Sequence, residues 1–185
     1  MSKAISWVAV DWGTSNLRAW GISADGAVVF ERSSDKGMGK LSKEEFAPAL
    51  LELVGHEGEQ QPNVEILVCG MAGAKQGWLE APYVEAPADL KSLYQNAVHP
   101  QVTGTTLNVS ILPGVCQKGG DENVMRGEET QLLGLAALRE GYAGMVCMPG
   151  THSKWAKLSG TRIEHFSTAM TGEMFEVLRT HSVLR

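Results

Sequence analysis

The sequence contains the same pattern of strands and turns twice, and this repetition constrains the fold more than any other feature. Residues 5–33 read "ISWVAVDWGTSNLRAWGISADGAVVFERS", three apolar runs separated by the turn signals "DWGTS" and "SADG". Residues 144–170 repeat the pattern, with "PGTHS" and "SGT" between the runs. Apolar runs bounded by Gly, Asn, Asp and Ser predict strands joined by tight turns. We therefore expect two three-stranded meanders, in which Gly13-Thr14 is equivalent to Gly150-Thr151 and Ala19 to Ala156.

The segments around the meanders predict an α/β protein. "VEILVCG", residues 64–70, is a continuous apolar run, which is typical of a strand covered on both faces. Apolar residues recur at helical spacing over residues 42–54 and 88–98, and good helix formers fill residues 128–140. A further helix is expected from Thr171 or Gly172. Ser42 and Glu45 stand at capping-box spacing before the first of these helices.

The two meanders suggest two lobes. Residues 1–140 are expected to form an N-terminal lobe, and residues 141–185 the beginning of a second, similar lobe. Three strands and one helix leave too little chain to complete a second sheet, so we expect the chain to be a fragment.

Composition excludes several classes of partner. The chain has 185 residues, is 43% apolar and 20% charged, and carries a net charge of −5 without a Lys/Arg stripe. Nucleic acid is therefore not expected as a partner, because binding its backbone needs grouped cations. No run suits a signal peptide or a bilayer span, so no membrane partner and a cytoplasmic location are expected. The three cysteines, Cys69, Cys116 and Cys147, lack metal-ligand spacing, which indicates reduced thiols rather than a zinc site. The sequence does not indicate an oligomeric state.

The first turn carries residue types that suit a phosphate chain. A glycine lets backbone N–H groups approach phosphate oxygens, hydroxyl and amide side chains donate to them, and a carboxylate can hold Mg²⁺ through water. The run after the first strand supplies all three: Asp11, Gly13, Thr14, Ser15 and Asn16. The alternative is an ordinary hairpin with a polar turn. Neither GxxxxGK[ST] nor GxGxxG occurs, so a P-loop or dinucleotide-binding fold is not supported.

The second turn repeats the glycine and adds cations. Gly150, Thr151, His152 and Lys154 are candidate phosphate ligands, and paired with the first turn they predict a two-sided phosphate clamp. The alternative places Lys154 in solvent on an exposed strand face.

Acidic residues gather before the helix expected from residue 128. The stretch "DENVMRGEETQ" holds Asp121, Glu122, Arg126, Glu128 and Glu129. A carboxylate at a fixed position can act as a general base, and a helix N-terminus favours its ionised form. Arg126 can bind a substrate carboxylate through its planar fork. Plain helix capping is the alternative explanation.

A long loop follows the buried strand. "CGMAGAKQGWLEAPYVEAPA" places small residues directly after the strand, where open α/β sheets bind ligands. Gly70, Met71 and Gly73 are candidate substrate contacts, and Trp78 a candidate wall of the pocket. Alternatively, Trp78 only closes the core.

Taken together and in this order, "VAVDWGTSNLRAW", "GMAGAKQGWLEAPY", "NVMRGEETQLLG", "MPGTHSKW" and "TAMTGE" closely resemble the 2-dehydro-3-deoxygalactonokinase family. The resemblance covers nearly the whole chain. It implies the ribonuclease H-like, actin-like ATPase fold, a mixed sheet flanked by helices, with the incomplete start of a second similar lobe. It also implies ATP- and Mg²⁺-dependent phosphorylation of 2-dehydro-3-deoxy-D-galactonate at its terminal hydroxyl, in galactonate catabolism.

The resemblance implies roles for individual residues. Asp11 resembles the aspartate that orients magnesium, residues 13–16 the first phosphate loop, and residues 150–152 the second. Glu128 is the expected base, with Asp121 next. Two other functions stay open: a phosphohydrolase of the same superfold, and a non-catalytic half-enzyme that binds a sugar acid but not ATP.

Overall fold

The computed structural model describes residues 4–55, 64–102 and 107–183. The chain divides into two compact units: Met1–Pro82 with Leu93–Gly114, and Tyr83–Ser92 with Val115–Arg185. This division differs from the expected lobes, 1–140 and 141–185, because the elements between residues 115 and 140 group with the later strands. The lobes were inferred from the repeated pattern rather than from packing, and their boundary stays a prediction.

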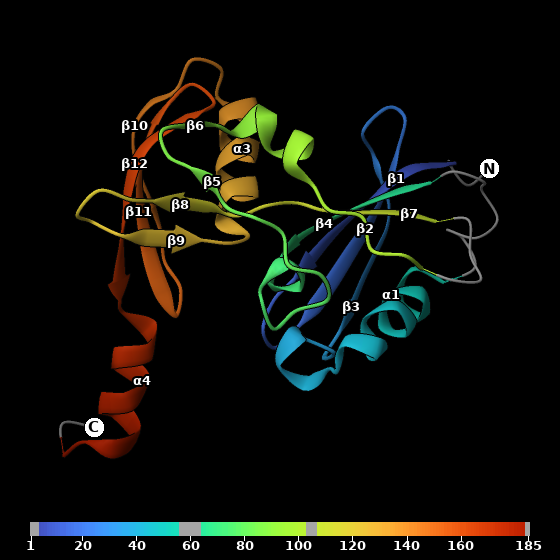
Figure 1. Ribbon diagram of the computed structural model, residues 1–185, viewed down its shortest axis with the longest axis horizontal. Helices are drawn as coiled ribbons and strands as arrows, with labels where there is room; N and C mark the ends of the chain where they lie inside the picture. The colour runs from blue at the N-terminus through green and yellow to red at the C-terminus, as the bar shows by residue number, and fades with distance from the viewer. Residues whose placement is uncertain (1–3, 56–63, 103–106, 184–185) are drawn as a thin grey trace. The chain divides into compact units, whose positions relative to one another are not determined.

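Unit 1 is built on a five-stranded mixed sheet in the order β3-β2-β1-β4-β7 (Figure 1). Its strands are β1 (Ile5–Trp12), β2 (Leu17–Ser23), β3 (Val28–Ser34), β4 (Glu65–Gly70) and β7 (Asn108–Ile111). The first three form the predicted antiparallel meander. β4 lies parallel to β1, and β7 lies parallel to β4. The carboxyl ends of β1 and β4 therefore meet at one edge of the sheet.

The predicted first helix is α1 (Phe46–Val54), preceded by the short 3-10 helices η1 (Met38–Lys40) and η2 (Lys43–Glu45). The capping box between Ser42 and Glu45 is present, and Pro48 lies in the first turn of α1, where no intrahelical N–H is required. The apolar face of α1 joins the core of unit 1, which gathers these side chains from helix and strands: Val8, Val10, Trp12, Leu17, Phe46, Leu50, Ile66, Val68 and Ile111.

Unit 2 contains two sheets. The larger has the order β10-β11-β12-β6, all antiparallel, from β10 (Ala143–Met148), β11 (His152–Ser159), β12 (Arg162–Met170) and β6 (Ala88–Asp89). The smaller has the order β5-β8-β9, from β5 (Val84–Glu85), β8 (Val115–Gln117) and β9 (Asn123–Met125). Helix α3 (Glu128–Leu138) follows β9, and the sequence predicted a helix here. The second meander, β10 to β12, is confirmed, and Ala156 pairs with Val146 as Ala19 pairs with Val10.

Two local predictions differ from the structure. Residues 88–98 hold β6 and the 3-10 helix η4 (Leu90–Asn96) instead of an α-helix. Leu90 and Leu93 are its buried residues, and their spacing of three suits a 3-10 helix as well as an α-helix. The polar stretch 115–125 forms the β8–β9 hairpin, for which the sequence predicted no strand, because each strand is only three residues long.

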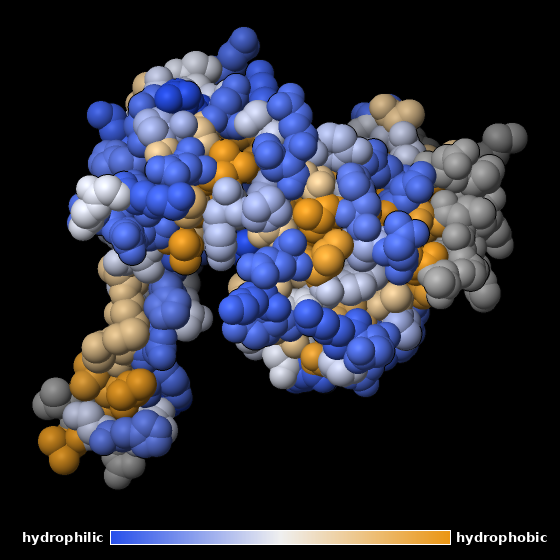
Figure 2. Space-filling view, in the orientation of Figure 1, coloured by the Kyte–Doolittle hydropathy of each residue, from blue (hydrophilic) through white to orange (hydrophobic). Residues whose placement is uncertain are grey.

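The last element, α4 (Gly172–His181), begins where the sequence predicted. Met174, Phe175, Val177 and Leu178 lie along one side of it, and each is more than 40% exposed. Figure 2 shows these apolar side chains at the surface of α4. Among the residues that the structure describes, there is no helix that combines the length and the apolar character needed to cross a bilayer.

Candidate functional site

The first turn, residues 13–16, is held by hydrogen bonds to a segment that follows β3. The Gly13 amide donates to the Asn16 carbonyl (2.8 Å), which closes the turn. The Met38 amide donates to the Gly13 carbonyl (3.0 Å), and the Gly39 amide to the Thr14 carbonyl (2.9 Å). Because a trans peptide directs its C=O and N–H to opposite sides, the amides of Thr14 and Ser15 point away from residues 38 and 39. Both residues are exposed, so these amides are available to an anion.

Gly37 makes this approach possible. A Cβ at position 37 would lie 2.2 Å from the Ser15 carbonyl carbon and 2.4 Å from the Thr14 oxygen. No side chain fits at these distances, so the loop can pack on the turn only through a glycine. Sequence analysis did not identify this contact with the turn.

Asp11 and the small residues after β4 lie side by side at the same sheet edge. In the parallel pairing of β1 with β4, Asp11 is opposite Cys69 and Trp12 is opposite Gly70. Gly70 has φ +89°, and a Cβ there would lie 2.6 Å from the Trp12 carbonyl oxygen and 3.5 Å from Asp11 Oδ1. Unit 1 thus brings together the predicted carboxylate, the first turn and the start of the long loop.

Beyond Gly70, the loop forms the short helix η3 (Met71–Gly73) and then folds back on itself. The Trp78 amide donates to the Ala72 carbonyl (2.8 Å), and the Ala81 amide to the Gly73 carbonyl (3.0 Å). The Trp78 ring packs near Trp12 and Phe46, with centroids 6.1 Å from each. Trp78 therefore contributes to the core, and its role as a substrate wall stays a prediction, as do those of Gly70, Met71 and Gly73.

The second turn, residues 149–151, is held in the same way by the start of α4. The Gly172 amide donates to the Gly150 carbonyl (3.2 Å), and the Glu173 amide to the Thr151 carbonyl (3.1 Å). A Cβ at position 172 would lie 2.6 Å from the Gly150 oxygen, so this contact also requires glycine. By the same peptide geometry, the amides of Thr151 and His152 point away from α4.

The two turns therefore share a hydrogen-bonding pattern as well as a sequence pattern. In each, the carbonyls of a Gly-Thr pair accept hydrogen bonds from two consecutive amides of the helical segment that follows the third strand of the meander. In each, a glycine of that segment permits the close approach. Two similar strand patterns do not by themselves require this shared long-range bonding, so it supports an internal repeat.

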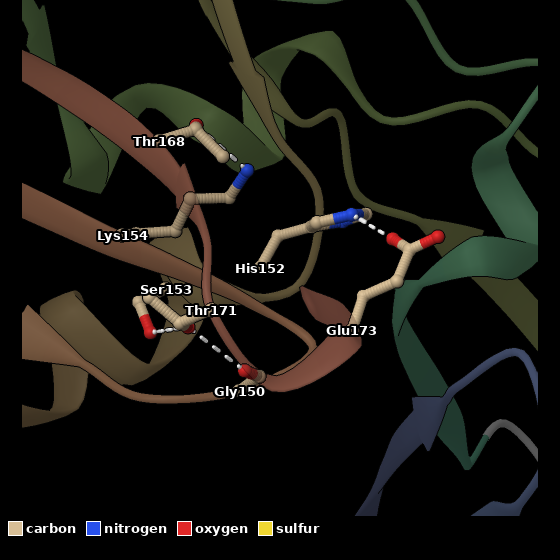
Figure 3. Close-up of polar contacts among 7 residues, drawn as sticks. All are labelled: Gly150, His152, Ser153, Lys154, Thr168, Thr171 and Glu173. Carbon is tan, nitrogen blue, oxygen red and sulfur yellow. Dashed lines mark hydrogen bonds and ion pairs between the residues drawn. The ribbon is translucent and has the colours of Figure 1, made fainter. Parts of the chain in front are cut away.

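Side chains strengthen the second turn (Figure 3). The hydroxyls of Ser153 and Thr171 are hydrogen-bonded to each other, and Thr171 Oγ1 donates to the Gly150 carbonyl (3.3 Å). His152 Nε2 lies 2.6 Å from Glu173 Oε2. His152 and Ser153 are the first residues of β11, so they belong to the strand and not to the predicted turn.

Lys154 is buried in unit 2. Its ammonium donates to the Val124 carbonyl of β9 (2.8 Å) and to Thr168 Oγ1 of β12 (3.0 Å), as Figure 3 shows for Thr168. Burial lowers the pKa of Lys154, and the nearby charge of Glu128 opposes that shift. The predicted alternative, a solvent-exposed lysine, is wrong, because only 7% of the residue is exposed. Its hydrogen bonds tie the β8–β9 hairpin to the larger sheet, and a contact with phosphate stays a prediction.

The acidic residues separate into three environments. Asp121 is exposed in the turn of the β8–β9 hairpin, where its backbone carbonyl accepts from Gln117 and Asn123. Glu128 is half-buried, and its Oε2 accepts the Arg126 amide (3.0 Å). Glu129 is fully buried, and both of its carboxylate oxygens lie 2.8 Å from the Gly127 amide. Burial is the main cause that raises the pKa of Glu129 to about 7.

Arg126 lies over an aromatic ring that the sequence did not identify. β5 and β9 flank β8, so Tyr83 just before β5 and Arg126 just after β9 lie at the same end of the small sheet. The Arg126 guanidinium carbon is 4.3 Å from the Tyr83 ring centroid, and Nε donates to the Tyr83 hydroxyl (3.4 Å). A guanidinium oriented in this way suits a planar anion such as a carboxylate.

A family model described as 2-keto-3-deoxy-galactonokinase matches residues 11–185. The chain belongs to this kinase family. Both turns, the acidic stretch and the long loop lie within the matched residues.

Curated relatives agree with the family assignment. A probable 2-dehydro-3-deoxygalactonokinase of Rhizobium meliloti (strain 1021) is 46% identical over 187 residues, covering 100% of this chain and 60% of the relative. The 2-dehydro-3-deoxygalactonokinase of Escherichia coli (strain K12) is 37% identical, covering 96% of this chain and 58% of the relative. The chain thus spans about 60% of the length of the curated relatives that it matches.

Solved structures confirm the predicted fold class. A Sinorhizobium meliloti protein assigned as a 2-dehydro-3-deoxygalactonokinase has a TM-score of 0.86 at 46% identity, over 96% of this chain and 58% of its own. An Aquifex aeolicus Ppx/GppA phosphatase has a TM-score of 0.52 at 13% identity, over 94% of this chain and 54% of its own. The second likeness shows the fold alone, the actin-like α/β class.

The residues of this kinase-family chain fit a hydrated magnesium ion beside a phosphate chain. Asp11 has a carboxylate that is 28% exposed at the carboxyl end of β1, directly before the first turn. Mg²⁺ keeps several waters and takes only one or two protein carboxylates when phosphates supply other ligands. Within the described ranges, no three His, Cys, Asp or Glu side chains are grouped as a metal site.

Proposed function

We propose that the protein is a sugar-acid kinase that transfers the γ-phosphoryl group of ATP to the terminal (6-) hydroxyl of 2-dehydro-3-deoxy-D-galactonate, in galactonate catabolism. The observation that carries this proposal is the equivalent support of the two Gly-Thr turns. Each presents outward-pointing amides, the groups that bind phosphate oxygens without a cation. Membership of the kinase family supplies the substrate class.

The chain's residues have separable roles in this reaction. Glu128 accepts the proton of the sugar hydroxyl as the new O–P bond forms and the bond from the γ-phosphorus to the bridging oxygen of ADP breaks. Its Oε2 is held by the Arg126 amide, so its orientation is defined before the substrate binds. Asp121, the second candidate base, is exposed in the turn of the β8–β9 hairpin.

The remaining residues bind and orient. In unit 2, Arg126, oriented by Tyr83, would hold the carboxylate of the sugar acid. In unit 1, the candidate substrate contacts are Gly70, Met71, Gly73 and Trp78. Amides and hydroxyls of residues 13–16 in unit 1, and those of residues 150–152 in unit 2, are each proposed as phosphate ligands, with Lys154 beside the second turn. Asp11 would hold Mg²⁺ through water, and the ion would neutralise phosphate charge.

We also propose a cytoplasmic location. The three cysteines are odd in number and far apart in the sequence, a pattern typical of reduced thiols in a reducing compartment, where ATP is also available.

The test is a coupled assay for ADP release by the purified chain, with a panel that includes 2-dehydro-3-deoxy-galactonate and 2-dehydro-3-deoxy-gluconate. The proposal expects turnover that depends on a sugar acid, prefers the galactonate compound, and falls at least about 100-fold in Glu128→Gln. Glu122→Gln, an exposed acid of the same stretch, is the matched control and should keep the wild-type rate.

Other outcomes identify the two rival functions. Phosphate release without any sugar acid indicates a phosphohydrolase and contradicts the proposal. Calorimetric binding of the sugar acid without binding of Mg-ATP indicates a half-enzyme and contradicts the proposal.

A further inference from the structure

Glu129 is an acid that the proposed reaction does not use. Glu129 is fully buried, with 0% of the residue exposed, and it directly follows Glu128, the proposed base, in the sequence. Burying a carboxylate is costly unless hydrogen bonds or charges compensate. Here the compensation is the Gly127 amide, 2.8 Å from both oxygens, together with the positive end of the α3 dipole.

The Gly127 peptide groups are fixed on both sides. Its N–H donates to Glu129, and its carbonyl accepts from Thr130 Oγ1 (2.6 Å) and from the Thr130 amide (3.2 Å). Gly127 has φ +111°, a conformation that residues with a side chain rarely adopt. The chain therefore makes one defined corner between Arg126 and Glu128.

This corner determines where the proposed base lies. Glu128 follows Gly127 directly, and its side chain turns back to accept the Arg126 amide on the other side of the glycine. The Gly127 N–H belongs to the peptide between Arg126 and Gly127, which lies inside the segment that the contact between the Arg126 amide and Glu128 closes. A group that holds this N–H restrains that segment, and through it the contact that orients Glu128.

We propose that Glu129 is a positioning residue for the reaction: its buried carboxylate holds the Gly127 amide and thereby fixes the place of the Glu128 carboxylate. This inference rests on the proposed function, in which Glu128 is the base. Glu129 itself contacts no reacting atom.

Burial and two neighbouring charges shift the pKa of Glu129. Burial is the largest cause and raises the pKa, the charge of Glu128 on the same helix also raises it, and the charge of Arg126, before the helix, lowers it. From the larger sheet, Lys154 of β11 interacts with the charge of Glu128. An ionised carboxylate accepts the Gly127 N–H more strongly than a protonated one. The hold on Gly127 therefore tightens as Glu129 loses its proton.

The first test needs no variant. In the chain labelled with ¹⁵N and ¹³C, the Gly127 amide resonance is followed from pH 5 to 9 together with the side-chain carboxyl carbon of Glu129. The two should move with a common midpoint. A Gly127 resonance that stays constant while Glu129 titrates overturns the proposal.

The second test uses Glu129→Gln, with Glu128→Gln as its matched partner. In Glu129→Gln the Gly127 transition should be lost and the resonance of the Arg126 amide, which donates to Glu128, should shift, whereas Glu128→Gln should keep the Gly127 transition. A wild-type Arg126 amide resonance in Glu129→Gln overturns the positioning role.

Kinetics separate positioning from a structural role. Glu129→Gln should lower kcat about tenfold or more and remove the pH dependence of kcat near neutrality, with KM for the sugar acid unchanged. An equal loss at every pH would contradict positioning through the ionised group. If the wild-type chain turns over no sugar acid, the proposed function fails for this chain, and the two resonance experiments still decide whether Glu129 holds Gly127.

Discussion

Asp11 and Arg18 are cross-strand partners of β1 and β2, and Arg18 Nη2 lies 2.6 Å from Asp11 Oδ2. Their side chains are 28% and 54% exposed. An ion pair this accessible to water contributes at most about 1 kcal/mol to stability. The pair therefore orients the Asp11 carboxylate beside the first turn more than it stabilises the fold.

From this relationship, Asp11→Asn should change the free energy of unfolding by less than about 1 kcal/mol and abolish turnover. Urea unfolding and the ADP-release assay measure the two effects. Arg18→Gln is the control: it should unfold like the wild type and keep part of the activity. An Asp11→Asn chain that is unfolded, or that turns over normally, would count against the assigned role.

Gly37→Ala should disturb the first turn. A Cβ would lie 2.2 Å from Ser15 backbone, which the loop must relieve by moving, at a cost of about 1–3 kcal/mol. The Thr14 and Ser15 amide resonances should shift as well. Gly39→Ala is the matched substitution, since its Cβ would lie 3.3 Å from the Thr14 oxygen and require only a small adjustment. Equal effects of the two would show that close packing at residue 37 is unimportant.

Gly150, in the second turn, should tolerate replacement by alanine better than Gly172, at the start of α4. A Cβ at Gly150 meets nothing closer than 3.6 Å, whereas one at Gly172 would lie 2.6 Å from the Gly150 oxygen. Thermal unfolding should therefore show little change in Gly150→Ala and a loss of about 1–3 kcal/mol in Gly172→Ala. The reverse order would contradict the described contact between α4 and the turn.

Lys154 is expected to act through its hydrogen bonds to Val124 and Thr168. Lys154→Ala should cost about 1–3 kcal/mol in urea unfolding, because two acceptors lose a partner and the stem leaves a cavity. Lys154→Met keeps most of the volume and should cost less. Should Lys154→Met fold normally and lose Mg-ATP binding, the ammonium contacts phosphate as well.

Stability should fall as pH rises through the titration of Glu129. Its pKa is raised from 4.5 to about 7 in the folded chain, so the folded state binds more protons than the unfolded state between these values. The free energy of unfolding should therefore decrease by about 3 kcal/mol from pH 4.5 to 7 and then level off. Urea unfolding at a series of pH values measures this slope. Glu129→Gln should be flatter over the same range, and an unchanged slope in that variant would assign it to other groups.

The elements with strong local signals were predicted correctly. β1 to β3 and β10 to β12 follow from apolar runs bounded by turn residues, and α1 follows from a capping box before a helical apolar pattern. Residues 88–98 show the limit of such signals, since Leu90 and Leu93 suit either type of helix. The β8–β9 hairpin was missed because its short polar strands depend on pairing with each other and, through Gln117 and Lys154, on bonds to the larger sheet.

For the site, the sequence by itself determined which residues are candidates: Asp11, the two Gly-Thr turns and the acids before α3, because their chemistry is visible in residue type and local order. Only the tertiary structure decided how they are held. Gly37 and Gly172 allow other segments to pack closely on the two turns. Tyr83 lies beside Arg126, and Glu129 is buried. Hydrogen bonds between distant segments depend on which residues the fold brings together, and so does the exclusion of water from a carboxylate. A local sequence pattern does not contain that information.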